Sequence, residues 1–354
     1  MAENGPREDL AKLISEKIFE KFKWRQHGPT DHDFPCEDEI NHKPADKKTQ
    51  HTHPVDVVFH YKDPYLNKTI YLNTDLKSYS KGALNNKMIE AGLSSLAKTI
   101  DCASFSSLWS ERYITSVGQY EIRGMLFVYN HDNDFQHDFY NFFHPEKPAK
   151  GKRAAAVNLD NIDLKSGQQL HIIEPKTINY LMAVVSDMNE MIAEFRFPRN
   201  DYGFFYPQLT FHKVLTSEEY LPATIETLTS PFMIIKHGPV IDYDRSICSD
   251  VTKYPEGYVI YYNRPGTSEL EFSYLLDALS SYQILNAKNN IRIRVAGQNK
   301  TEGVRSNFTR ALEKYAHEWG YDEAAKEKLY SIELHIVPVQ KEFYSTDERS
   351  WGLN

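Results

Sequence analysis

Three charged residues lie inside two segments that otherwise favour β-strands. Asp56 belongs to HPVDVVFHY at residues 53–61, and Asp75 and Lys77 belong to KTIYLNTDLKSY at residues 68–79. Strand interiors disfavour Asp and Lys. Two close carboxylates repel each other, so the pKa of one should rise unless a cation lies between them. Two carboxylates suit Mg²⁺, because they supply oxygen ligands and leave coordination positions of the ion open for water and phosphate.

The alternation of side chains along a strand predicts that these residues meet. Residues two apart share a face, so Asp75 and Lys77 point the same way. The sequence DPYLN at residues 63–67 favours a turn, and an antiparallel hairpin is the simplest pairing. With Asp56 beside Asp75, two carboxylates and an ammonium converge. A metal there would stabilise charge on an attacked phosphorus, and Lys77 would orient or help deprotonate a water.

The same three residues also have a purely structural explanation. Asp75 and Lys77 could form an exposed ion pair of small energetic value on a solvated strand face. Antiparallel sheets commonly have such a face. The spacing of one Asp followed 19 residues later by Asp-x-Lys is weak as a pattern by itself, and its position between two predicted helices makes it more specific.

A helix predicted over residues 7–23 could supply a further acid. Its apolar residues recur near a period of 3.6. Glu16 and Glu20 lie one turn apart at the edge of that apolar stripe. Either could reach the site if the helix packs across the hairpin, and Glu16 is preferred because the apolar residues after it continue the buried face.

The remaining elements predict two α/β regions. A helix at 84–100 and a strand at 121–129 complete the first, which we place at residues 1–145, with a linker at 146–170 and a second α/β domain at 171–354. In the second region we expect helices at 177–195, 269–285 and 303–319, and strands at 204–213, 231–237, 257–263, 290–296 and 329–339.

The order of helix, strands, helix and strand, with these charges, resembles the PD-(D/E)XK nuclease superfamily over roughly residues 7–130. The resemblance implies an αβββαβ core with a mixed central sheet that cleaves DNA with a divalent metal, Mg²⁺ or Mn²⁺. The family's Pro-Asp is here Pro54-Val55-Asp56, and FKWRQH at 22–27 is the candidate for its first core strand. Lys77 matches the family's lysine. The metal ligands that the resemblance implies are Asp56, Asp75, the carbonyl of Leu76, and Glu16 or Glu20.

Two basic groups are candidates for contacts to a nucleic-acid backbone. One lies within residues 288–310 and the other near residue 150, although an ordinary charged surface explains each as well. The net charge of −8 differs from the basic balance usual in proteins that coat nucleic acid, which makes a partner subunit plausible. The candidates are Arg292, Arg294, Lys300, Arg305, Lys150, Lys152 and Arg153.

The cysteine and histidine patterns argue against a structural zinc site. Three cysteines occur far apart with no CxxC pair, which is typical of a reducing cytoplasm. Five histidines between residues 27 and 53, with Cys36 and several acids nearby, could suggest a transition-metal site. Their spacing fits no ligand pattern, so we expect solvated loop histidines. The polar, acidic start is unlike a signal peptide, and no apolar run is long enough to cross a membrane.

These observations predict a cytoplasmic, metal-dependent endonuclease that hydrolyses DNA, with a role in bacterial defence against phage or foreign DNA. We expect a partner protein subunit or a homo-oligomer. One alternative is a non-catalytic scaffold subunit that keeps the nuclease fold. Another is a phosphodiesterase that acts on RNA or small nucleotides.

Overall fold

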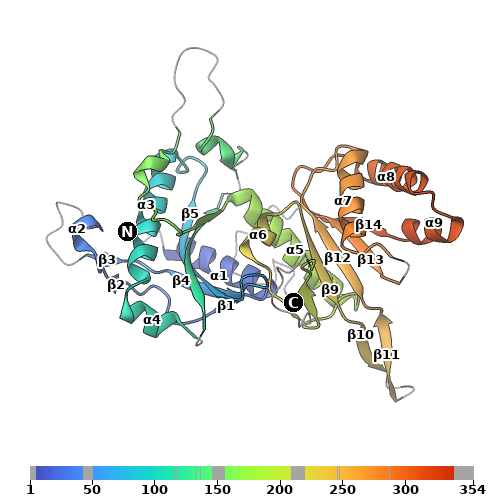
Figure 1. Ribbon diagram of the computed structural model, residues 1–354, viewed down its shortest axis with the longest axis horizontal. Helices are drawn as coiled ribbons and strands as arrows, with labels where there is room; N and C mark the ends of the chain where they lie inside the picture. Colours follow the sequence, from blue (N-terminus) through green and yellow to red (C-terminus); the bar gives the residue numbers. More distant parts are fainter. Residues whose placement is uncertain are drawn as a thin grey trace, which may run out of the picture. The chain divides into compact units, whose positions relative to one another are not determined.

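The computed structural model describes residues 5–42, 51–115, 118–132, 134–135, 137–145, 156–208, 220–244, 246, 248–286 and 288–338 (Figure 1). These residues form two compact units. The first unit takes in the described residues of 5–63 and 67–178, and the second those of 64–66 and 179–338. Within the described part of the chain, no helix is both long and apolar enough to cross a membrane.

A mixed sheet of five strands forms the centre of the first unit, in the order β1-β4-β5-β6-β7. Strands β1, β4 and β5 pair antiparallel, whereas β5, β6 and β7 pair parallel. This mixed sheet confirms the predicted fold class. The strands are β1 Arg25–Gln26, β4 Val57–Lys62, β5 Thr69–Tyr79, β6 Tyr120–Asn130 and β7 Leu170–Ile173.

The predicted hairpin is confirmed and its register is now fixed. Val57 lies opposite Thr74, and Phe59 lies opposite Leu72. The edge strand β1 pairs with β4 through Arg25 opposite His60, within the segment predicted as the first core strand. The hairpin therefore brings the start of β4 next to the middle of β5.

The two faces of this sheet are covered by different helices. Helix α1, Gly5–Lys21, places Phe19 against Phe59 and Phe127, with ring centroids 4.9 and 6.0 Å apart. Helix α3, Asn86–Ala103, packs its buried leucines against Leu126 and Val128 on the other face. Each side of β5 therefore has its own apolar support.

Gly124 in β6 permits the close approach of helix α3. A Cβ at this position would lie 2.7 Å from Leu96 Cγ and closer still to Leu170 Cδ2. Real Cβ contacts are longer than this, so any larger residue would force the Leu96 or Leu170 side chain to move.

Short elements surround the first sheet. The strands β2 and β3 form a small antiparallel ribbon, with Phe34 opposite His53. The short elements are β2 Phe34–Pro35, α2 Glu39–His42, β3 Thr52–His53, α4 Ser107–Tyr113, and the 3₁₀ helices η1 Phe139–Phe142 and η2 Leu159–Asn161.

The second unit contains another five-stranded sheet, in the order β14-β13-β12-β9-β8. Strands β12, β13 and β14 are parallel, and β9 and β8 are antiparallel additions.

A large apolar cluster joins one face of this sheet to helices α7 and α8. The elements are β8 Tyr202–Phe204, β9 Phe232–His237, β12 Gly257–Tyr262, α7 Glu269–Ser281, β13 Ile291–Val295, α8 Val304–Glu318, α9 Glu323–Tyr330 and β14 Glu333–Ile336. Helices α5 Pro175–Ala193 and α6 Ile225–Thr229 and the hairpin β10 Val240–Asp244 and β11 Ser249–Tyr254 complete the described elements.

Four details differ from the sequence-based expectations. The strand expected at 204–213 is β8, which ends at Phe204, and residues 209–213 lie outside the described residues. The predicted linker and the start of the second domain contain β7, which pairs in parallel with β6, and the division between the units falls after Ile178. Residues 329–332 belong to the end of α9 and a turn rather than to a strand. The β10–β11 hairpin was not predicted, because its exposed strands lack an apolar alternation.

Candidate active site

Asp56, Asp75 and Lys77 meet at one place on the first sheet. Lys77 Nζ lies 2.5 Å from Asp75 Oδ1. Asp56 Oδ2 accepts a hydrogen bond from the backbone N–H of Leu76 at 2.6 Å. The predicted convergence of two acids and a lysine is present.

Strand register explains why these side chains converge. Asp56 directly precedes β4, and its neighbour Val57 lies opposite Thr74, so Asp56 comes next to Asp75. Asp75 and Lys77 share a face of β5 because they are two residues apart. Lys77 Nζ therefore reaches back along the strand to the Asp75 carboxylate.

Asp56 is half-buried, which makes its charge costly. Burial, followed by the charge of Asp75, raises the pKa of Asp56 to about 7. The hydrogen bond from Leu76 and the charge of Lys77 act in the opposite direction. A carboxyl group with such a pKa holds a proton near neutrality until a cation replaces it.

Lys77 remains a cation in this setting. Burial lowers the pKa of Lys77, but the charge and hydrogen bond of Asp75 and the charge of Asp56 outweigh it, so the pKa lies above its ordinary value. Its side chain is 37% exposed, against 13% for Asp75. The Lys77 side chain is thus more open to a substrate than that of Asp75.

The candidate acids of helix α1 are not joined to this cluster. Glu16 is half-buried and Glu20 is exposed. Among the described residues, no hydrogen bond or ion pair links either of them to Asp56, Asp75 or Lys77. Helix α1 covers the face of Phe59 and Phe127, whereas Asp75 and Lys77 share the face of Leu126 and Val128. A role for Glu16 or Glu20 stays a prediction.

The donor set at the cluster suits a hard divalent cation. Asp56 and Asp75 would supply carboxylate oxygens, and Leu76, which lies between Asp75 and Lys77, would supply its backbone carbonyl, all of which Mg²⁺ and Mn²⁺ accept. The closeness of the two half-buried carboxyl groups supports this fit, because a cation between them would offset the repulsion that helps to raise the pKa of Asp56.

Arg292 and Arg294 do not form the predicted nucleic-acid contact. They are buried, with exposures of 1% and 3%. Arg294 Nε donates to Asp187 Oδ2 at 2.8 Å, and Arg292 Nη1 donates to the carbonyl of Arg196 at 2.8 Å. Their guanidinium groups hold α5 and its following turn on the sheet, so a phosphate backbone has no access to them.

The other basic candidates differ in accessibility. Lys300 is partly buried and donates to the carbonyl of Val337. Arg305 is exposed and donates to the carbonyl of Leu334 at 3.2 Å. Of these, Arg305 keeps surface for a phosphate. Lys150, Lys152 and Arg153 lie outside the described residues.

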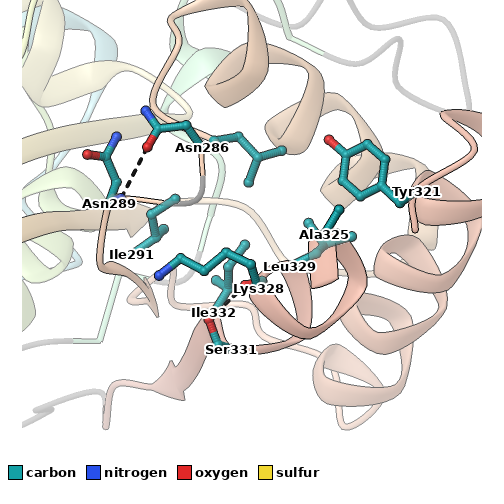
Figure 2. Close-up of a pocket in the computed structure, with 10 residues that line it drawn as sticks. Asn286, Asn289, Ile291, Tyr321, Ala325, Lys328, Leu329, Ser331 and Ile332 are labelled. Carbon is teal, nitrogen blue, oxygen red and sulfur yellow. Dashed lines mark hydrogen bonds between the residues drawn. The ribbon is translucent and has the colours of Figure 1, made fainter. Parts of the chain in front are cut away.

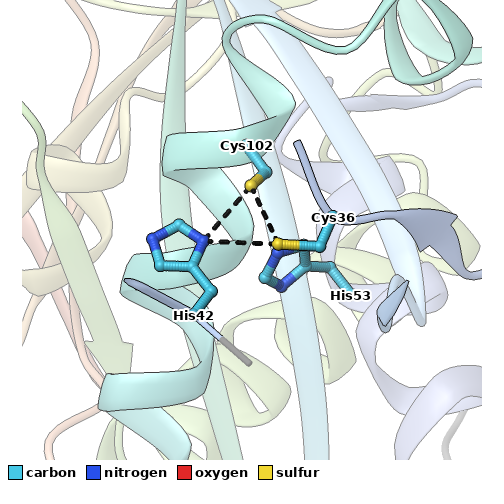
Figure 3. Close-up of side chains that lie close together, drawn as sticks. All are labelled: Cys36, His42, His53 and Cys102. Carbon is cyan, nitrogen blue, oxygen red and sulfur yellow. Dashed lines mark hydrogen bonds between the residues drawn. The ribbon is translucent and has the colours of Figure 1, made fainter. Parts of the chain in front are cut away.

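Sequence reasoning missed a second cluster in the first unit. Cys36, His42, His53 and Cys102 are buried, and their ligand atoms all lie within 4.8 Å of one another (Figure 3). The expectation of solvated loop histidines is wrong for His42 and His53. No spacing rule could have found the set, because Cys102 comes from helix α3, 49 residues after His53.

One cavity of the second unit is lined by no Asp, Glu, His or Cys side chain. It encloses about 130 Å³ between α9 and the segment before β13 (Figure 2). Its walls are largely apolar, and Lys328 is the one charged side chain among its lining residues. Asp56, Asp75 and Lys77 are not part of it.

Comparison with known proteins identifies the first unit. The family model described as GAPS4 protein PD-(D/E)XK nuclease domain matches residues 1–177, half of the 354-residue chain. This range includes β7 and all three residues of the site cluster. No curated protein and no solved structure matches the chain.

Proposed function

We propose that this chain, which belongs to the GAPS4 PD-(D/E)XK nuclease domain family, is an endonuclease that hydrolyses DNA with Mg²⁺ or Mn²⁺. The convergence of Asp56, Asp75 and Lys77 carries the proposal. Asp56, Asp75 and the carbonyl of Leu76 would hold the ion. The bound ion would supply Lewis-acid stabilisation of charge on the phosphoryl oxygens and a more acidic water.

The protein side chains have separate tasks in this proposal. Asp56 gives up its proton when the site is loaded, because its carboxylate then has a cation as partner. The Lys77 ammonium is held by Asp75, and the Lys77 side chain is the more exposed of the two. From there it can donate to the scissile phosphate and orient the attacking water.

Membership of this family supports nuclease activity, and DNA as the substrate is our proposal. We further propose that the chain acts in the cytoplasm in bacterial defence against phage or foreign DNA, with a partner subunit or a second copy. The net charge of −8 favours such a partner, because an acidic chain repels DNA at long range. Arg305 is the described basic candidate that keeps surface for the backbone of DNA.

A substrate panel tests this function. Supercoiled plasmid, linear duplex DNA, single-stranded DNA and RNA are incubated with the full chain and Mg²⁺ or Mn²⁺, alone and with the protein encoded beside it. We expect metal-dependent cleavage of DNA that stops with EDTA. Cleavage of RNA alone would replace the DNA proposal with the RNA alternative.

A further inference from the structure

The second cluster of the first unit has the composition of a zinc site. Cys36 follows β2, His42 ends α2, His53 lies in β3, and Cys102 lies in the last turn of α3. All four residues are at most 8% exposed. Two thiolates and two imidazoles are a frequent ligand set of structural Zn²⁺, and four protein ligands leave no position for a substrate.

The distances between the donor atoms suit a tetrahedral ion. With Zn–S of about 2.3 Å and Zn–N of about 2.0–2.1 Å, two sulfurs lie roughly 3.8 Å apart and a sulfur and a nitrogen roughly 3.6 Å apart. Cys36 Sγ and Cys102 Sγ are 3.7 Å apart. His42 Nδ1 lies 3.7 Å from Cys36 Sγ and 3.3 Å from Cys102 Sγ (Figure 3).

Neither a disulfide nor an iron–sulfur cluster fits the paired sulfurs as well as a single zinc ion does. A disulfide requires about 2.05 Å between sulfurs, and these are 3.7 Å apart. An iron–sulfur cluster with two Cys and two His ligands binds its histidines to a different iron from its cysteines. His42 Nδ1 contacts both sulfurs, so the ligands surround a single ion.

Hydrogen bonds around the cluster support thiolates and an oriented imidazole. The backbone N–H of Glu37 donates to Cys102 Sγ at 3.3 Å. On the other side of the His42 ring, Nε2 lies 3.4 Å from Asp101 Oδ2. A carboxylate behind the second ring nitrogen fixes the tautomer and raises the basicity of a ligating histidine.

We propose that Cys36, His42, His53 and Cys102 bind a structural Zn²⁺ ion. The ion fastens the segment between β1 and β4 to the end of helix α3. This site is separate from the cluster of Asp56, Asp75 and Lys77, here called the nuclease cluster, and does not depend on the proposed function.

The position of this segment links the zinc site to the nuclease cluster. His53 precedes Asp56 by three residues. Residues of the same segment also hold the backbone there, since the Asp31 N–H donates to the Asp56 carbonyl at 3.0 Å and the His32 N–H donates to the Val55 carbonyl at 3.1 Å. The ion therefore stabilises the stretch of chain that leads into Asp56.

Metal analysis of the purified full chain tests the proposal. We expect stoichiometric zinc by plasma mass spectrometry in the wild type, and at least a tenfold loss in Cys102→Ser and in His42→Ala. Cys248→Ser is the matched control, because this cysteine is exposed and lies in the second unit. Asp75→Ala should also keep its zinc, which separates this site from the nuclease cluster.

Cobalt substitution keeps the test decisive if a ligand variant fails to fold. The wild type, stripped of metal and loaded with Co²⁺, should show sulfur-to-cobalt charge transfer and the intense visible bands of tetrahedral cobalt. Zinc should displace them. A wild type that holds no zinc and shows no such bands, a Cys36–Cys102 disulfide in the mass spectrum, or full zinc in Cys102→Ser would overturn the proposal.

Discussion

Asp56 Oδ2 accepts the backbone N–H of Leu76 at 2.6 Å. This bond fixes the acid at the entry to β4 against the residue between Asp75 and Lys77. It crosses from one strand to the next, so the three functional groups keep their relative positions as long as the hairpin is paired. The nuclease cluster is thus built into the sheet rather than carried on a loop.

The charge on Asp56 predicts a stability that depends on pH. Its pKa is about 7 in the folded chain, against an ordinary value of 3.8, so the folded state binds this proton more tightly than the unfolded state. Protonated Asp56 therefore stabilises the folded state. This contribution to the free energy of unfolding is fully present below about pH 4 and is lost as the pH rises to about 7. Asp56→Asn resembles the protonated acid, and its amide oxygen can still accept the Leu76 N–H.

Urea unfolding in EDTA measures this dependence. At pH 8 we expect Asp56→Asn to be more stable than the wild type by a few kcal/mol. At pH 4 the two should agree. A constant difference between them across this range would contradict the raised pKa of Asp56.

A divalent ion should restore the stability that the wild type loses when Asp56 ionises. At pH 8, Mg²⁺ or Mn²⁺ at about 100 times its dissociation constant should stabilise the wild type by roughly 2.7 kcal/mol. Asp75→Asn should show little of this effect, because one of the two carboxylate ligands is gone. Thermal unfolding with and without the ion gives the comparison, and equal gains in both proteins would place the ion elsewhere.

Gly124 should tolerate no side chain. Gly124→Ala forces Leu96 or Leu170 to move, since its Cβ would lie within 2.7 Å of both, and we expect a loss of about 1–3 kcal/mol. Gly82→Ala is the control, because no atom lies within 4 Å of its added Cβ. Chemical denaturation compares the two variants, and an equal stability would show that the α3 contact is loose.

The buried pair in the second unit should be structural. Asp187 accepts from Arg294 Nε and from the hydroxyl of Tyr261, each at 2.8 Å. Asp187→Ala leaves the Arg294 charge buried without its partner and should cost about 3–5 kcal/mol. Glu323→Ala breaks only an exposed pair with Lys326 and should change the unfolding midpoint little. A similar, small loss in both variants would contradict the structural role.

The sequence was sufficient to predict those structural features that depend on local patterns of residues. The β-branched and aromatic residues of 55–61 and 68–79, with the turn between them, predicted the hairpin, and the apolar pattern of residues 84–100 predicted α3. The placement of Asp56, Asp75 and Lys77 followed from these two patterns, because strand pairing leaves few registers once one face is buried.

Features made by distant residues escaped prediction. Arg292 and Arg294 read as surface charges, and only packing against Asp187 and the Arg196 carbonyl shows that they are buried. Strand β7 has four residues and becomes a strand through pairing with β6. Cys102 joins the two histidines only because α3 packs beside the β2–β3 ribbon.

A cleavage assay with matched lysine variants tests the central claim most directly. Plasmid is incubated with Mn²⁺ or Mg²⁺ and wild type, Lys77→Ala or Lys81→Ala, after each is shown to be folded. Lys81 is also in the first unit but pairs with Asp134 at 3.8 Å on the surface. We expect cleavage by wild type and Lys81→Ala, and a rate at least about 100-fold lower for Lys77→Ala. Cleavage by Lys77→Ala at the wild-type rate would contradict the account.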